Sequence, residues 1–171
     1  MTHSATLIPA PSGLSPEAFV DEYGGLYEHS PWVAQRVAGE IGSGELDTVA
    51  RLHQALSEAM LAASEEEQMQ LVRAHPDLAT RAAVTADSAS EQASVGLDQC
   101  TAAEFSRFTE LNDAYKQRFG FPFIMAVRGS NRHLILEAFE QRISHEPRHE
   151  FLTALAEINK IALFRLFQRF P

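Results

Sequence analysis

SEEEQMQLVRAHPDLATRAAVTADSASEQASVGL, residues 64–97, is the stretch that decides how this chain folds. It opens with the start of a helix, because the Ser64 side chain can accept from the first-turn N–H groups and Glu67 can reach back to the Ser64 N–H. Pro76 ends the helix, since proline lacks an amide hydrogen and crowds the residue before it. His75 is therefore expected in the last turn.

A helix C-terminus favours the charged form of His75. The exposed carbonyls and the negative end of the helix macrodipole stabilise an imidazolium, so we expect the pKa of His75 to be raised. A histidine that titrates near neutral pH is a suitable proton donor.

A second polar group follows across an alanine-rich connector. Ser88, Glu91 and Gln92 offer a hydroxyl, a carboxylate and an amide at the start of another short helix. The spacing Ser88-x-x-Glu91 is also that of a capping box, so a structural role for both residues is the alternative interpretation.

Composition favours one helical domain that acts on a small molecule or a protein. The 171 residues are 45% hydrophobic, and no linker divides them, so we expect a single domain over residues 15–171. Residues 1–14 have no apolar period and are expected to form a flexible tail. The net charge of −9 argues against a nucleic-acid surface or an anionic membrane face. No run of about 18 apolar residues is present to span a bilayer.

The sequence points to the cytoplasm. Cys100 is the only cysteine, so an intramolecular disulfide is excluded and a reducing compartment fits. Residues 1–14 lack the basic and apolar regions of a signal peptide. Residues 168–171 do not match a peroxisomal signal.

Start signals and apolar periods predict helices along most of the chain. Ser15-Pro16 and Ser30-Pro31 each place proline after a cap residue. From Asp47 on, apolar residues recur at spacings of three and four, which predicts one helical face made of Val49, Leu52, Leu56, Ala59 and Ala63.

The second half of the chain continues in the same way. Thr101 and Glu104 form a capping box, and the helix that they begin should stop at Gly120. Residues 131–145 are helical by period, and the last helix begins near Pro147. The inward side of the 131–145 helix is predicted to be Leu134, Ile135, Ala138 and Phe139. The class is all-α, with roughly eight helices.

Residues 121–127, FPFIMAV, are the only strand-like run. Pro122 and the lack of a second strand favour an extended, buried connector. Its backbone groups need partners other than a sheet, and a ligand rich in amide groups can supply them.

Arg165 interrupts an apolar stripe of the last helix. At 100° per residue it lies within about 60° of Phe151, Ala154, Ile158, Ile161 and Ala162. Arginine keeps its charge, so burial there demands an anion. That anion is either an internal carboxylate, from Glu91 or another acid, or the carboxylate of a ligand. The other side of the helix is also apolar, which predicts a homodimer, through Leu163, Phe164, Leu166, Phe167 and Phe170.

One motif resembles a zinc site but is interrupted. His145-Glu146-Pro147-Arg148-His149 matches H-E-x-x-H, which needs both histidines on one continuous helix. Pro147 forces His145 out of the helical region. We therefore predict a charged helix junction and no metal site.

Taken together, the motifs of this chain resemble the OHCU decarboxylase family, where OHCU is 2-oxo-4-hydroxy-4-carboxy-5-ureidoimidazoline. The resemblance covers residues 15–167, and the motifs come in the family's order. They are His75-Pro-Asp-Leu78, Ser88-x-x-Glu91-Gln92, Leu111-Asn112-x-x-Tyr115, Phe119-Gly-Phe-Pro-Phe-Ile124, and Glu157-Ile158-x-Lys160-Ile161-Ala162 with Arg165-Leu166.

The resemblance implies an all-helical, dimeric enzyme without a cofactor, which converts OHCU into (S)-allantoin and carbon dioxide in urate degradation. His75 is implied as the proton donor, with Glu91 and Arg165 as the other catalytic groups. The residues implied to bind the substrate are Pro76, Ser88, Gln92, Phe123, Ile124, Met125, Ala126 and Val127.

The chemistry agrees with such a site. Loss of carbon dioxide leaves a carbanion that the neighbouring ring carbonyl delocalises, so no cofactor has to accept the electrons. Arg165 and the amides of residues 123–127 suit charge stabilisation, and His75 suits proton delivery. Glu91 either orients His75 or holds the substrate hydroxyl. The alternative class is a helical interaction module without enzymatic activity, whose dimer helix is its purpose.

Overall fold

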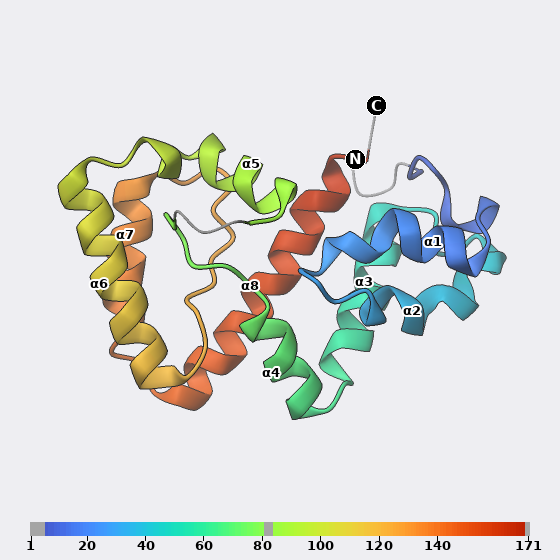
Figure 1. Ribbon diagram of the computed structural model, residues 1–171. Coiled ribbons are helices and arrows are strands. Elements are labelled where there is room, and N and C mark those ends of the chain that lie inside the picture. The colour runs from blue at the N-terminus through green and yellow to red at the C-terminus, as the bar shows by residue number, and fades with distance from the viewer. Residues whose placement is uncertain (1–5, 81–83, 170–171) are drawn as a thin grey trace. The chain divides into compact units, whose positions relative to one another are not determined.

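The computed structural model describes residues 6–80 and 84–169. Within these ranges, one isolated bridge joins Thr6 and Thr48, and the regular structure is otherwise helical. The eight α-helices of the described residues are α1 (Pro16–Tyr23), α2 (Trp32–Val37), α3 (Val49–Leu61), α4 (Glu65–Arg73), α5 (Ala86–Ser94), α6 (Ala102–Phe119), α7 (Arg132–Arg142) and α8 (Pro147–Phe167) (Figure 1). The predicted all-α class is confirmed.

The described residues group into two units. One unit contains residues 6–74 and 159–169, and the other contains residues 75–158. The helix α8 contributes residues to both, because it continues from Pro147 to Phe167. His75, Glu91 and the connector at 121–127 belong to the second unit, whereas Arg165 belongs to the first.

Residues 6–14 are fixed to the first unit. Leu7 is fully buried, and its N–H donates to the carbonyl of Asp47 at 2.7 Å. The Ser12 N–H donates to the Asp47 carboxylate at 2.8 Å, and the Tyr23 hydroxyl donates to the Pro9 carbonyl. The flexible-tail prediction is therefore wrong for residues 6–14, and residues 1–5 lie outside the described ranges.

Of the two predicted serine caps, one forms. Ser15 accepts from the Ala18 N–H at 3.1 Å, and α1 begins at Pro16. The Ser30 hydroxyl instead donates to the Glu28 carbonyl at 2.8 Å, so α2 begins at Trp32 without a side-chain cap. A short hydroxyl side chain can bond to nearby backbone in several ways, and here the alternative bond forms.

Helix α3 follows the predicted pattern as far as Leu61, but Ala63 lies beyond its end, and α4 begins where predicted. Thr48 caps α3, whose inward side is fully buried at Val49, Leu52, Leu56 and Met60. Ser64 and Glu67 form the predicted capping box at the start of α4, with both reciprocal hydrogen bonds present. The predicted N-terminus of α4 is confirmed.

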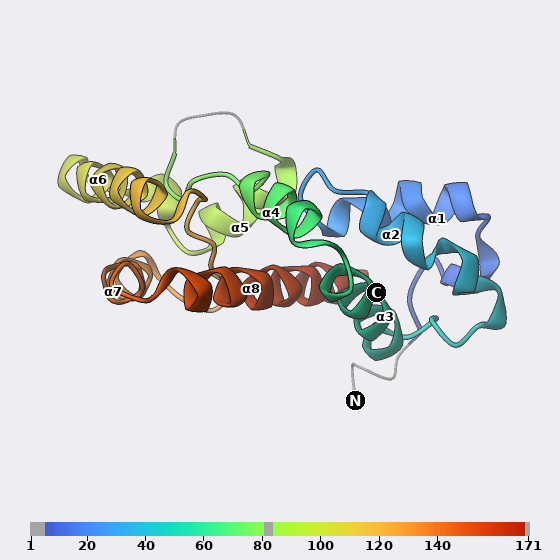
Figure 2. The same ribbon diagram turned by 90° about the horizontal axis from the view of Figure 1, so that it is seen from below.

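In the second unit, α6 and α7 run side by side, as Figures 1 and 2 show. Thr101 and Glu104 form the predicted capping box, and α6 ends at Gly120, whose φ of 77° suits glycine. Ile135 and Phe139 point inward from α7 with 0% exposure, but Leu134 is 52% exposed. The inward prediction for Leu134 is therefore wrong: it lies about 140° around the helix axis from Phe139, at the edge of the stripe.

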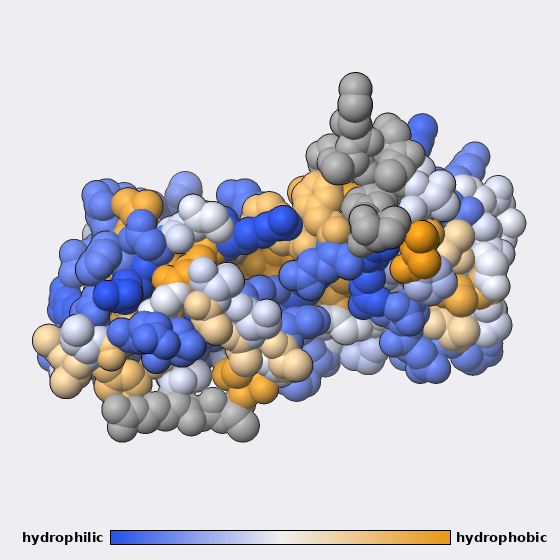
Figure 3. All heavy atoms as spheres, turned by 90° about the horizontal axis from the view of Figure 1, so that it is seen from above, coloured by the Kyte–Doolittle hydropathy of each residue, from blue (hydrophilic) through white to orange (hydrophobic). Residues whose placement is uncertain are grey.

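The face of the protein that Figure 3 shows is mainly polar. The large hydrophobic side chains that are most exposed come from separate parts of the described chain: Ile8, Leu61, Leu134 and Leu152. None of the helices within residues 6–80 and 84–169 is long and apolar enough to cross a bilayer.

Candidate active site

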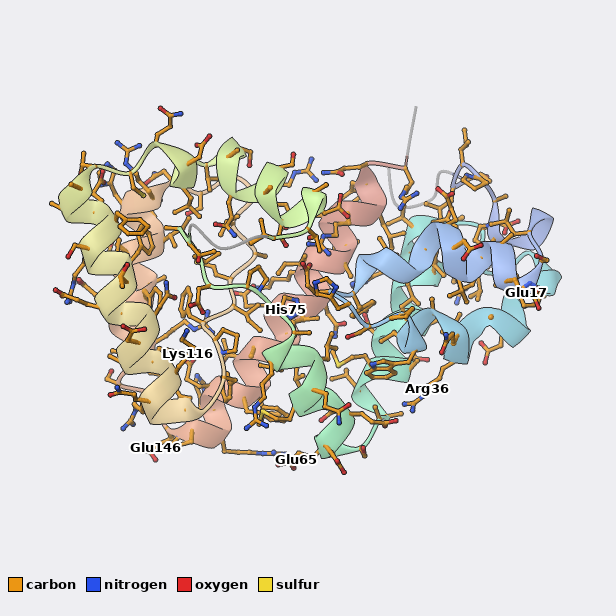
Figure 4. The ribbon with its side chains drawn as sticks, viewed as in Figure 1. Glu17, Arg36, Glu65, His75, Lys116 and Glu146 are labelled. Atoms are coloured by element: carbon orange, nitrogen blue, oxygen red, sulfur yellow. The ribbon has the colours of Figure 1, made fainter. Side chains whose placement is uncertain are left out.

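His75 lies two residues after the last residue of α4 and is buried. The helix ends at Arg73, Ala74 forms its C-cap, and the His75 residue is 8% exposed (Figure 4). The helix thus ends ahead of Pro76 as predicted, but His75 lies outside the last turn in which it was predicted. The raised pKa of His75 stays a prediction.

The segment after His75 is held by side chains from two other helices of its unit. Asn112 Nδ2 on α6 donates to the Leu78 carbonyl at 3.0 Å. Gln92 Oε1 on α5 accepts from the Ala79 N–H at 2.9 Å. Ala79 has a φ of 55°, a left-handed conformation that costs a non-glycine residue on the order of 1 kcal/mol.

A third contact to the segment after His75 comes from α6. Lys116 Nζ lies 2.7 Å from Asp77 Oδ2, and Figure 4 places Lys116 on α6. Both side chains are partly exposed, so this ion pair contributes little stability by itself. Residues 77, 78 and 79 are thus each anchored by a different side chain.

The predicted capping box at Ser88 does not form. Thr85 caps α5 and accepts from the Ser88 N–H at 3.2 Å, which places Ser88 inside the helix. Glu91 therefore lies beyond the first turn and is not a capping residue, so the capping-box interpretation of Ser88-x-x-Glu91 is wrong. The sequence misled because Thr85 and Ser88 are both favourable cap residues and only one of them can cap the helix.

One face of α5 brings its polar residues together. Ser88, Glu91 and Gln92 are spaced three and four apart, so their side chains share a side of the helix. Ser88 is 6% exposed, and Gln92 contacts the backbone of Ala79. The face that carries Glu91 is therefore the face turned toward the segment after His75.

Residues 121–127 form the predicted extended, buried connector. Phe121, Phe123 and Ile124 are at most 3% exposed, and the Phe123 ring stacks on Phe139 with centroids 3.9 Å apart. The Ala126 N–H donates to Glu157 Oε2 at 3.4 Å. Side chains of the protein therefore hydrogen-bond to some of the backbone groups for which a ligand was the predicted partner.

A buried arginine that sequence reasoning missed holds this connector. Arg142 Nη1 donates to the Ile124 carbonyl at 2.7 Å, and the guanidinium lies 4.3 Å from the centroid of the Phe123 ring. One charged group therefore fixes two consecutive residues of the predicted substrate-binding run.

Glu150 neutralises Arg142 and is fully buried. It accepts from Arg142 Nη2 at 3.0 Å and from the Tyr115 hydroxyl, and His145 Nδ1 lies 3.0 Å from its Oε1. Burial alone raises the pKa of Glu150, but the hydrogen bonds from Arg142 and Tyr115 outweigh it, so the pKa lies below its usual value. Burial and the hydrogen bond to Glu150 raise the pKa of Tyr115.

The sequence contains a signal that could have identified Arg142. Arg142 lies seven residues after Ile135 and three after Phe139, within the apolar stripe of α7. That is the same anomaly that singled out Arg165.

The interrupted zinc motif forms a helix junction. His145 precedes α8 and contacts Glu150, while His149 lies in the first turn of α8. Among the described residues, no group of three or more His, Cys, Asp or Glu side chains lies close enough together to hold a metal ion.

Arg165 is buried in the first unit and paired with Glu28. Its Nη2 donates to Glu28 Oε2 at 3.0 Å, and its Nη1 donates to the carbonyls of Gly25 and Leu26 at 3.3 Å. Arg165 is 4% exposed. The sequence required an anion here, and the structure provides an internal carboxylate, that of Glu28.

The turn that carries Glu28 is itself fixed. The Tyr27 hydroxyl donates to Asn159 Oδ1 at 2.8 Å, and His29 adopts a φ of 47°. The Ser30 hydroxyl donates to the Glu28 carbonyl. This local network holds the carboxylate against Arg165.

Comparison with known proteins agrees with these motifs. The model of the OHCU decarboxylase family matches residues 12–167. A 2-oxo-4-hydroxy-4-carboxy-5-ureidoimidazoline decarboxylase of Haloferax volcanii is 45% identical over 157 residues, which cover 92% of each chain. The protein of the same name from Halalkalicoccus jeotgali is 47% identical over 150 residues, covering 88% of this chain and 84% of that protein.

A solved structure also matches. The crystal structure of (S)-allantoin synthase superposes with a TM-score of 0.77 at 32% identity and covers 96% of this chain. This chain spans 54% of that one, about half its length. The family match extends over nearly all of the sequence and includes every predicted site residue, and so this chain belongs to the OHCU decarboxylase family.

Proposed function

We propose that this chain decarboxylates OHCU to (S)-allantoin and carbon dioxide in urate degradation. The observation that carries the proposal is that the family match over residues 12–167 includes His75, Glu91 and Arg165. The related proteins of Haloferax volcanii and Halalkalicoccus jeotgali carry the name of this activity.

In the proposed reaction the bond between the ring carbon and its carboxylate breaks. Carbon dioxide leaves from C4, which also bears the hydroxyl, and the electron pair is delocalised over C4, C5 and the neighbouring ring nitrogen as an enol. A proton from the His75 imidazolium then adds to C5, which bears the ureido group, and the C4 hydroxyl loses its proton and becomes the carbonyl of (S)-allantoin. Proton transfer of this kind typically contributes about 10² to 10⁴ in rate.

The other groups bind and stabilise charge in this proposal. Arg165 binds the substrate carboxylate, and its orientation is preset by Glu28 and by the carbonyls of Gly25 and Leu26. Amides of residues 123–127 stabilise the developing enolate. Glu91 either orients His75 or holds the substrate hydroxyl. Pro76, Ser88 and Gln92 are the remaining residues that we propose to contact the substrate.

The product's handedness provides the test. Uncatalysed protonation of a planar enolate reaches both faces equally and gives a racemate, whereas a fixed donor reaches one face. OHCU is generated in situ from urate and mixed with the purified full chain, and circular dichroism follows the allantoin. We expect a rapid optical signal with this chain and none with His75→Asn. The absence of an optical signal with the wild-type chain would contradict the activity and favour the interaction module.

We also propose that the enzyme is a cytoplasmic homodimer. Leu163, Phe164 and Phe167 on the last turns of α8 are only partly buried, which suits a face covered by a second copy. The single cysteine suits a reducing compartment. Light scattering of the full chain should give twice the mass of 18.9 kDa, and a mass of one chain would rule the dimer out.

A further inference from the structure

Asn112 is a buried amide in the middle of α6 with an unusual hydrogen-bond balance. The residue is 5% exposed, and its Nδ2 donates to the Leu78 carbonyl at 3.0 Å. Its Oδ1 is buried without a hydrogen-bond partner among the described residues. A carbonyl can only accept, so this contact forces the amide to present Nδ2 to Leu78 and to turn Oδ1 away.

The hydrogen bond of Asn112 brings little net stability. Burying an unpaired acceptor costs at least as much as one neutral hydrogen bond returns. An apolar side chain of similar volume would remove the unpaired oxygen but would leave the Leu78 carbonyl without this donor. What the amide of Asn112 provides is therefore a fixed position for the Leu78 carbonyl.

That carbonyl lies three residues after His75. Pro76 lies between them, and its ring fixes φ, so the backbone from His75 to Leu78 has less freedom than an ordinary segment. A constraint at Leu78 is therefore transmitted to the position of the imidazole. Lys116, one helical turn after Asn112 on the same side of α6, holds Asp77 in the same segment.

We propose that Asn112 is a positioning residue for His75. The proposal rests on the proposed function, in which His75 donates the proton to the enolate. Asn112 acts through the backbone of Leu78 and sets where the imidazole lies relative to the carbon that receives the proton. A displacement of about 1 Å at a reacting group can reduce a rate on the order of 100-fold.

The test compares Asn112→Leu with the full-length wild-type enzyme. The leucine side chain keeps the volume but cannot donate to Leu78. We expect kcat to fall about tenfold or more while KM stays within about twofold, because substrate binding is retained and proton delivery is impaired. Asn112→Ala serves as a second variant that fits the site even where leucine packs poorly, and the same split between kcat and KM is expected.

A control separates positioning from general destabilisation. Leu56→Ala removes a fully buried side chain of α3 in the other unit, and it should lower the melting temperature without changing kcat of the folded fraction. The pH dependence of the His75 ring resonance, observed by NMR, reads the environment of the imidazole without relying on activity. We expect it to change in Asn112→Leu and to stay constant in Leu56→Ala.

The outcomes are distinct. Unchanged kcat and an unchanged His75 resonance in both Asn112 variants overturn the positioning role, as does an equal loss of kcat in Leu56→Ala. If the wild-type enzyme itself shows no turnover of OHCU, the proposed function fails. The His75 resonance then still decides whether Asn112 positions the imidazole.

Discussion

Arg165 Nη2 lies 3.0 Å from Glu28 Oε2, although the two residues are 137 positions apart in the sequence. Both side chains are almost completely buried, at 4% and 1% exposure. A buried pair of this kind orients the guanidinium, and loss of either partner leaves an uncompensated charge. The contact that stabilises the fold therefore also orients the group that we propose to bind the substrate carboxylate.

Glu28→Gln should destabilise the protein by about 3–5 kcal/mol, because it removes the buried carboxylate that pairs with the Arg165 guanidinium. Urea unfolding measures this loss. The control is Glu140→Gln, which breaks a solvent-exposed pair with Arg107 and should cost less than about 1 kcal/mol. Equal losses in the two variants would show that burial of the Glu28 pair has no energetic consequence.

Arg165→Lys should raise KM by about tenfold or more in the folded protein, because lysine keeps the charge but loses the planar fork that grips a carboxylate. The variant should also be less stable, since one ammonium cannot replace the bonds to Glu28, Gly25 and Leu26. Steady-state kinetics on the folded fraction separates the two effects. A stability loss with unchanged KM would leave Arg165 as a structural residue only.

His75→Asn should keep the fold and lose at least about 100-fold in kcat, because the amide has no dissociable proton to deliver. His133→Asn is the matched control, since that side chain is 73% exposed on α7. Initial rates and thermal melting are measured for both variants. Near wild-type turnover in His75→Asn would exclude this residue as the donor.

Glu91→Gln should leave stability within about 1 kcal/mol of the wild type, because Thr85 caps α5 and Glu91 does not. Turnover should fall by about tenfold or more, since the change removes a negative charge from the proposed site. Asp87→Asn makes the same change of charge at an exposed position of the same helix and should leave turnover intact. Equal turnover in all three proteins would exclude a catalytic role for the carboxylate.

The Glu150 carboxylate should make the fold sensitive to acid. Its pKa is lower in the folded protein than the value of 4.5 for an unperturbed glutamate. It therefore adds stability that is fully present above about pH 4.5 and is lost as the pH falls through the folded pKa. Glu150→Gln should lower stability near neutral pH, by leaving Arg142 unpaired, and should flatten the dependence on pH below 4.5.

Urea unfolding from pH 3 to pH 7 measures this effect. Glu110→Gln removes a carboxylate whose side chain is 65% exposed and should keep the wild-type acid slope. A wild-type slope in Glu150→Gln would mean that other carboxylates carry the acid sensitivity.

The sequence predicted those helix boundaries that depend only on residues close together in the chain. The capping boxes of Ser64 with Glu67 and of Thr101 with Glu104 join residues three positions apart, so their hydrogen bonds are available as soon as the helix forms. The end of α6 at Gly120 has the same local origin, a left-handed cap that glycine adopts without strain.

Predictions failed where two local choices compete. Thr85 and Ser88 can each cap α5, and Ser30 can cap α2 or bond to Glu28. Leu134 lies at the edge of the apolar stripe of α7, and its 52% exposure depends on what α7 packs against. Periodicity cannot rank such alternatives, because their energies differ by less than one packing contact contributes.

The sequence by itself determined the all-α class, the start of α4 at Ser64 and its end ahead of Pro76, and the need of Arg165 for an anion. Those features follow from bonds between near neighbours and from the fact that arginine keeps its charge. Only the tertiary structure decided that Glu28 pairs with Arg165, that Glu150 pairs with Arg142, and that Asn112 holds Leu78. These choices depend on which distant residues meet in the core, where removal from water makes an unpaired charge or amide costly and so selects the partner.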